Sequence, residues 1–123
     1  MDPVQAFIDG FVFRVFRSAV SGTKSLLTNP PGRSPAPALV ALSQWYTRLS
    51  DNDRAQVDAI IAMASDLATF NAAAVLDGSA RVLPQGSELR VQIVSTGEVL
   101  TMTDNIGLHD RYREVIGPLG RDS

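Results

Sequence analysis

The residue best suited to chemistry is His109, the only histidine, in the segment Leu108-His109-Asp110-Arg111-Tyr112. An imidazole beside a carboxylate can exchange a proton near neutral pH, so His109 and Asp110 could form the centre of a small ligand site. Asp77 and Arg81 are candidates for the same site or for a recognition pair. The simpler alternative, which we favour, is that His109 and Asp110 are ordinary polar residues in a helix's first turn and that Asp77 and Arg81 fix a turn.

Motifs that would indicate catalysis are missing from the sequence. No segment matches G-x-S-x-G, G-x-x-x-x-G-K or H-E-x-x-H. A metal at His109 would need every other ligand from carboxylates on distant segments. The chain has no cysteine, which excludes disulfides, thiolate zinc sites and cysteine nucleophiles. We therefore expect no catalytic residue, no metal and no cofactor, and lean towards a protein that is not an enzyme.

Length and charge narrow the class of protein further. The 123 residues are 45% hydrophobic and 20% charged, as in one globular domain with a real core. The 11 basic and 13 acidic residues nearly cancel, whereas nucleic-acid binders usually carry a basic excess. We therefore expect no nucleic-acid partner.

The N-terminal sequence gives no reason to expect export. It begins Met1-Asp2-Pro3, with an acid where a secretory signal carries positive charge, and Asp9, Arg14 and Arg17 interrupt the apolar run. No stretch is expected to span a membrane, for which about 20 predominantly apolar residues are needed. A cytoplasmic protein is the expectation.

The N-terminal part is expected to form one helix followed by a linker. Asp2 can cap a helix over about Pro3–Val20, with a wide apolar arc that includes Phe7, Phe11 and Phe16. Four prolines and two glycines follow, so residues 22–37 are expected to form a loop or linker between residues 1–21 and an α+β core at 38–123. The helix could dock on this core, pack on a neighbouring subunit or swing free.

A short helix at about Ala38–Leu49 and a long one at about Asp51–Leu76 should follow, the second started by a capping box at Ser50. The long helix has an apolar face that we expect to enter the core: Val57, Ile60, Ile61, Ala64, Leu67, Ala68, Ala74 and Val75. Its opposite side is a strip of small residues around Asp66 that includes Ala62, Thr69 and Ala73. This strip could meet a second helix, a partner protein or solvent.

The last third of the chain changes to a period of two. Short strands are expected at Ala80–Leu83, Glu88–Val94 and Glu98–Thr103, then a helix at Leu108–Ile116. A small antiparallel sheet, as a hairpin or three strands, must lie on helices to be stable. The predicted fold class is therefore α+β, mostly helical, with the sheet packed on the long central helix.

Three short motifs resemble a family of small uncharacterised bacterial proteins: W-Y-x-x-L-S-D-N-D-R at Trp45–Arg54, V-L-D-G at Val75–Gly78, and L-H-D-R-Y at Leu108–Tyr112. The resemblance covers about residues 38–116 and brings no activity. It implies that His109-Asp110 and Asp77-Gly78 lie together.

Two functional hypotheses follow. The first is a regulatory or immunity-like binding protein that forms a homodimer or grips another protein, through the first helix (Phe7, Phe11, Phe16) or the small-residue strip (Ala62, Asp66, Thr69, Ala73). Its basis is an apolar arc wider than one small core needs. The second is a small enzyme or metabolite-binding protein with a site near His109 and Asp110, joined by Asp77 and Arg81.

Overall fold

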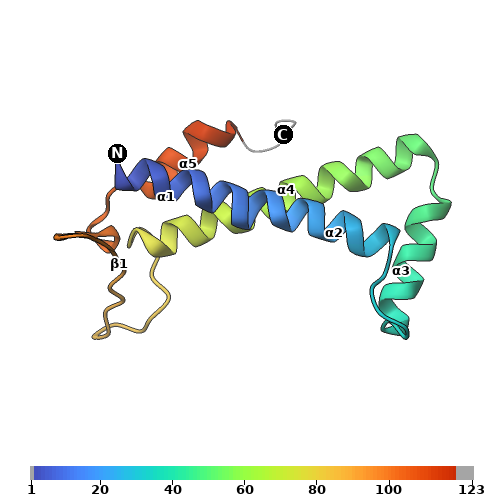
Figure 1. Ribbon diagram of the computed structural model, residues 1–123, viewed down its shortest axis with the longest axis horizontal. Helices are drawn as coiled ribbons and strands as arrows, with labels where there is room; N and C mark the ends of the chain where they lie inside the picture. Colours follow the sequence, from blue (N-terminus) through green and yellow to red (C-terminus); the bar gives the residue numbers. More distant parts are fainter. Residues whose placement is uncertain (1, 119–123) are drawn as a thin grey trace.

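The computed structural model describes residues 2–118 and consists mainly of two long helical rods that cross (Figure 1). The first rod joins α1 (Pro3–Phe11), η1 (Val12–Arg17) and α2 (Ser18–Thr28). Asp2 caps it, since its carboxylate accepts from the backbone N–H of Val4 at 3.0 Å. The second rod is α4 (Asp51–Leu76), capped by Ser50 as the sequence predicts. The mostly helical α+β fold class is confirmed.

The segment η1 is a turn of π-helix in the middle of the first rod. The buried residues of this rod, Val4, Ile8, Val12 and Phe16, recur every four positions. A spacing of four drifts around a helix of 3.6 residues per turn. The wider π turn, with its extra residue, offsets this drift and keeps Val12 and Phe16 on the face that contacts the core.

The linker predicted at residues 22–37 starts too early, because α2 continues to Thr28. A lone Gly22 does not stop the helix, and the hydroxyl groups of Thr23 and Thr28 donate back to helix carbonyls. The helix ends where Pro30 disfavours a helical conformation at the residue before it. The true connection is residues 29–36, and the first rod docks on the core of its own chain.

The helix α3 (Pro37–Arg48) descends from one end of the crossed rods (Figure 1). Ser43 donates to the carbonyl of Leu27 at 2.6 Å, which ties α3 to the last turn of α2. Tyr46 donates to the Asp58 carboxylate at 2.6 Å, which ties α3 to α4. This hydrogen bond, together with burial, raises the pKa of Tyr46 and keeps its hydroxyl group a donor.

At the other end of the rods lie the loop 79–91 and a two-stranded antiparallel hairpin, β1 (Gln92–Ser95) with β2 (Glu98–Thr101). Ile93 pairs with Leu100 on the core side, and Val94 pairs with Val99 on the exposed side. The strand predicted at Ala80–Leu83 does not form, and β1 begins four residues later than predicted. β2 gives way at Met102 to the short helix η2 (Met102–Asp104), so residues before Gln92 have no partner strand.

The last helix, α5 (Leu108–Ile116), has the predicted bounds and lies against both α1 and α4. The core therefore lies where α1, η1, α4 and α5 meet. Its fully buried residues include Ile8, Phe16, Leu108 and Tyr112, and the rings of Phe16 and Tyr112 pack edge to face at 6.5 Å.

The predicted core face of α4 is wrong over the middle of the helix, although Ala74 is buried and Val57, Ile61 and Val75 are half-buried. Ile60, Ala64, Leu67 and Ala68 are exposed, whereas Asp66, Thr69 and Ala73 are buried. The small residues let the first rod approach closely, and Asp66 finds partners on α5, so the strip of small residues meets a second helix of the same chain. Large apolar side chains are left on the outside of α4.

The composition of this helix bears on the expectation about membrane spans, which it leaves as a prediction. By length and composition alone, the 26 residues of α4 could cross a bilayer, although the core helix of a soluble protein can meet the same criterion.

Candidate functional site

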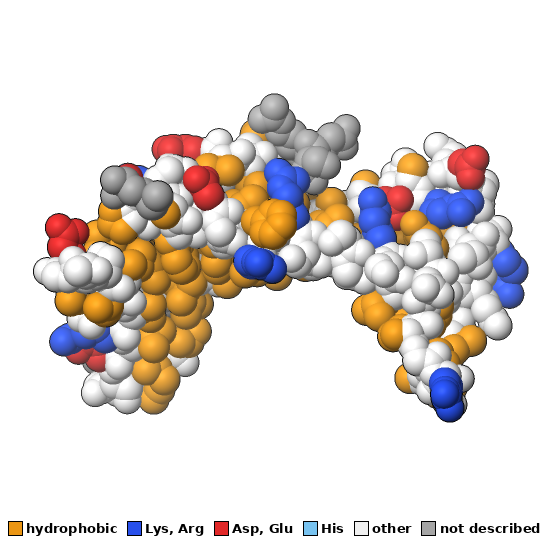
Figure 2. Space-filling view, viewed as in Figure 1, with side chains coloured by type: hydrophobic (Ala, Val, Ile, Leu, Met, Phe, Trp, Pro, Cys, Tyr) orange, Lys and Arg blue, Asp and Glu red, His pale blue; other side chains and the backbone are white. Residues whose placement is uncertain are grey.

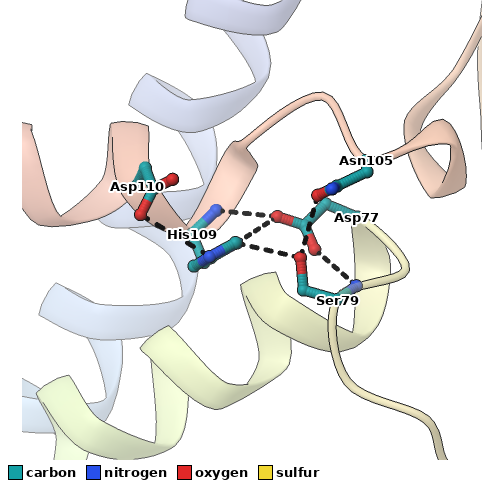
Figure 3. A network of polar contacts seen from close by, with 5 residues as sticks. All are labelled: Asp77, Ser79, Asn105, His109 and Asp110. Carbon is teal, nitrogen blue, oxygen red and sulfur yellow. Dashed lines mark hydrogen bonds and ion pairs between the residues drawn. The ribbon is translucent and has the colours of Figure 1, made fainter.

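The candidate residues His109, Asp110 and Asp77 do lie together, where α4 ends and α5 begins (Figure 3). Asp77 follows the last residue of α4, and His109 is the second residue of α5. Ser79 and Asn105, which the sequence did not single out, complete the cluster. The juxtaposition that the resemblance implied for Asp77-Gly78 and His109-Asp110 is therefore confirmed.

Asp77 is fully buried, and its carboxylate contacts three nitrogen atoms, two of the backbone and one of the His109 ring. Oδ1 accepts from the backbone N–H of Ser79 at 2.9 Å. Oδ2 accepts from the backbone N–H of His109 at 3.1 Å and also contacts His109 Nδ1. The residue before α5, Gly107, has no side chain to cap that helix, so Asp77 caps it from the end of α4.

Burial opposes ionisation of Asp77, but hydrogen bonds from Ser79 and His109 outweigh it and hold the pKa of this carboxyl below its ordinary value. Asp77 is therefore a charged acceptor across the neutral range.

The turn after Asp77 is shaped for this contact. Gly78 has a φ of 82°, and a Cβ there would lie 2.5 Å from the carbonyl oxygen of Thr103. Asn105, the only described residue other than glycine with a positive φ, donates its backbone N–H to the Asp77 carbonyl at 3.0 Å. The Ser79 hydroxyl donates to Asn105 Oδ1 at 3.0 Å. This hydrogen bond joins the turn after α4 to the turn before α5.

The cluster contains a serine, a histidine and an aspartate, but not in a catalytic order. In a nucleophile–histidine–carboxylate arrangement, the carboxylate and the nucleophile occupy opposite ring nitrogens. Here Ser79 Oγ, at 3.3 Å, and Asp77 both contact Nδ1, while Nε2 faces Asp110 Oδ1 at 3.5 Å. A proton taken from Ser79 would have to pass to the atom that already binds Asp77. The arrangement fits a structural junction between two helices.

The fourth candidate, Arg81, is not part of this cluster. It is exposed and lines an open depression of about 180 Å³ under the loop 79–91, together with Val82, Leu83 and Leu89. His109 and Asp77 do not line this depression. Among residues 2–118, no group of three or more histidine and acidic side chains could hold a metal ion.

A second polar cluster lies between α4 and α5, around Asp66. Tyr112 donates to Asp66 Oδ1 and Arg113 donates to Asp66 Oδ2, each at 2.9 Å. Burial and the bond to Asp66 raise the pKa of Tyr112 well above its ordinary value. The sequence singled out Asp66 as part of the strip of small residues but did not identify Arg113 or Tyr112 as its partners. Tyr112 lies four residues after Leu108, which predicts that both side chains point into the core. A buried tyrosine hydroxyl needs a hydrogen-bond acceptor, but the sequence pattern does not identify that acceptor.

The candidate interface residues are turned inward or partly covered. Phe7 and Phe11 stack with ring centroids 5.5 Å apart and are half-buried against the core, while Phe16 is buried. Ala62 is half-buried, and Asp66, Thr69 and Ala73 are buried within the chain. On α4 itself, the side left open to a partner is the opposite one, which carries Ile60 and Leu67 and which the sequence assigned to the core.

No protein-family profile, no curated protein and no solved structure matches this chain.

Proposed function

We propose that this chain is a non-catalytic protein-interaction domain that works as a homodimer, in a regulatory or immunity-like role in the bacterial cytoplasm. The observation that carries the proposal is the accessible surface of the single chain, 8160 Å². A compact monomer of 13.2 kDa is expected to expose about 6,400 Å². The difference exceeds the roughly 800 Å² that each partner contributes to a protein interface of standard size.

The kind of surface supports the same proposal. The crossed rods form the top of an arch, with α3 as one leg and the loop 79–91 with the hairpin as the other (Figure 2). Apolar side chains gather on the inner sides of both legs (Figure 2). Exposed residues include Leu42 and Trp45 on α3 and Val82 on the loop. Contiguous apolar surface of this kind marks interaction sites in soluble proteins.

A catalytic role has weaker support. The polar groups that could perform chemistry are used to join helices: Asp77 caps α5, and Asp66 holds Tyr112 and Arg113. A binding function needs none of them to be free.

The experiment that tests the proposal is light scattering on the full chain over a wide range of concentrations. A dimer, with twice the 13.2 kDa of one chain, is expected down to micromolar concentration. A mass of one chain at every concentration would remove the homodimer from the proposal.

A further inference from the structure

The outer face of α4 carries an unpartnered stripe of large apolar residues. Ile60 is 59% exposed, and Met63 and Leu67 are each 45% exposed. The stripe continues through Ala64 and ends in two exposed amides. We call these six residues the α4 seam: Gln56, Ile60, Met63, Ala64, Leu67 and Asn71.

The spacing of the seam is that of a helix–helix contact. Ile60, Ala64, Leu67 and Asn71 follow at intervals of four, three and four, as the a and d positions of coiled coils do, and Gln56 and Met63 flank them one heptad apart. Between Gln56 and Asn71 the two charged residues of α4 point elsewhere. Asp58 binds Tyr46 and Lys24, and Asp66 binds Tyr112 and Arg113. An uncharged seam can face a copy of itself without repulsion.

The seam is also complementary to itself when two copies run antiparallel. A two-fold axis between Met63 and Ala64 places Ile60 against Leu67 of the second copy and Met63 against Ala64 of the second copy. At the centre of the contact, a large side chain therefore faces a small one. The same axis places Gln56 against Asn71 of the second copy, so an amide meets an amide at each end and both can be hydrogen-bonded.

A parallel pairing would lack these matches. It would set Met63 against Met63 and bring together the exposed first-turn acids Asp51 and Asp53 of both copies. An antiparallel pair instead puts the two acidic N-termini at opposite ends of the contact, so that Asp51 and Asp53 of one copy lie far from those of the other.

A bilayer fits the seam less well than a second copy does. Gln56 and Asn71 would lie in hydrocarbon with no hydrogen-bond partner for their side chains, which is unfavourable. A second copy satisfies the amides and covers the apolar residues together.

We therefore propose that α4 packs antiparallel on α4 of a second copy through this seam, with residue pairs 60–67, 63–64 and 56–71. This inference rests on the homodimer proposed above and adds the surface, the direction and the register.

The first test is a charge placed in the seam. Leu67→Glu, at a residue 45% exposed, should raise the dissociation constant of the dimer at least 100-fold, whereas the matched control Val115→Glu, at a residue 47% exposed on α5, should leave it unchanged. Circular dichroism checks that both variants fold. A wild-type dimer that Leu67→Glu leaves intact would overturn the seam while the homodimer stands.

The second test reads the register and works even if a charged variant fails to fold. Because the chain has no cysteine, Ile60→Cys and Leu67→Cys each introduce the sole thiol. Under mild oxidation, each variant alone should remain uncross-linked, and a mixture of the two, one carrying an affinity tag, should form the mixed disulfide.

Three other results would overturn the inference, each in a distinguishable way. Efficient cross-linking of Ile60→Cys to itself would show a parallel pair. A wild-type chain that is a monomer would remove the homodimer and the seam with it. Co-sedimentation of the wild-type chain with phosphatidylcholine vesicles, abolished by Leu67→Glu, would assign the stripe to lipid.

Discussion

At the scale of single residues, Asp77 joins three segments of the chain. Its carboxylate binds the turn at Ser79 and the first turn of α5, and its carbonyl accepts from Asn105. The sequence identified Asp77 and His109 as chemically interesting and as candidates for one site. No sequence pattern could tell which ring nitrogen meets which partner, and that detail separates a helix junction from a catalytic arrangement.

Asp77→Asn should lower the free energy of unfolding by about 2 kcal/mol at pH 7, because it replaces a charged acceptor in a buried site. Since the folded-state pKa lies below the ordinary 3.8, the stability that the charge contributes is present above about pH 4 and is lost as the pH falls through the folded-state value. The difference between the wild type and the variant, measured by urea unfolding at pH 7, 5 and 3, should therefore shrink at the lowest pH.

The matched control is Asp110→Asn, since the Asp110 side chain is 77% exposed and faces the other ring nitrogen. It should change the free energy of unfolding by less than about 0.5 kcal/mol. Equal losses at Asp77 and Asp110 would contradict the assignment of Asp77 as the buried helix cap.

At the scale of helices and strands, what could be predicted depended on local signals. Ser50 and Gly78 mark the two ends of α4, and the structure has that helix at the predicted residues 51–76. Which face of α4 is buried is decided by tertiary contacts. Asp66 and Thr69 are buried and Ile60 and Leu67 are exposed, because α5 supplies partners for Asp66 and the first rod packs closely only on small side chains. Hydrophobicity alone could not show this.

Gly78 and Gly86 provide a test of how the end of α4 is built. Both have a positive φ, of 82° and 94°, but only at Gly78 would a Cβ meet another atom, the Thr103 carbonyl oxygen at 2.5 Å. Gly86→Ala should therefore lower the free energy of unfolding by about 1 kcal/mol, from backbone conformation alone. Gly78→Ala should lower it by about 3 kcal/mol or more, because backbone must also move.

Chemical denaturation of the two variants beside the wild type measures this difference. Equal losses would mean that the close approach of Gly78 to Thr103 is not a feature of the folded protein.

At the scale of the whole molecule, the arch follows from two rods that cross rather than lie along each other, with α3 and the hairpin end placed at opposite ends (Figure 1). The proline content of residues 22–37 predicted a break, but not that a helix would run to Thr28 first. The wide apolar arc of the first helix was the basis for expecting a partner there, but α4 and α5 of the same chain bury Phe16 and partly cover Phe7 and Phe11. Apolar surface remains uncovered on the outer face of α4 and on both legs of the arch.

The central claim is that the outer face of α4 is covered in solution, and the oxidation of Met63 by dilute peroxide tests it most directly. Met102, which is 3% exposed, serves as the internal reference for a buried thioether. Peptide mass spectrometry should find Met63 oxidised nearly as slowly as Met102 in the wild-type chain, and several-fold faster in Leu67→Glu. Fast oxidation of Met63 in the wild-type chain, at the rate seen in Leu67→Glu, would mean that α4 stays bare and would contradict the account.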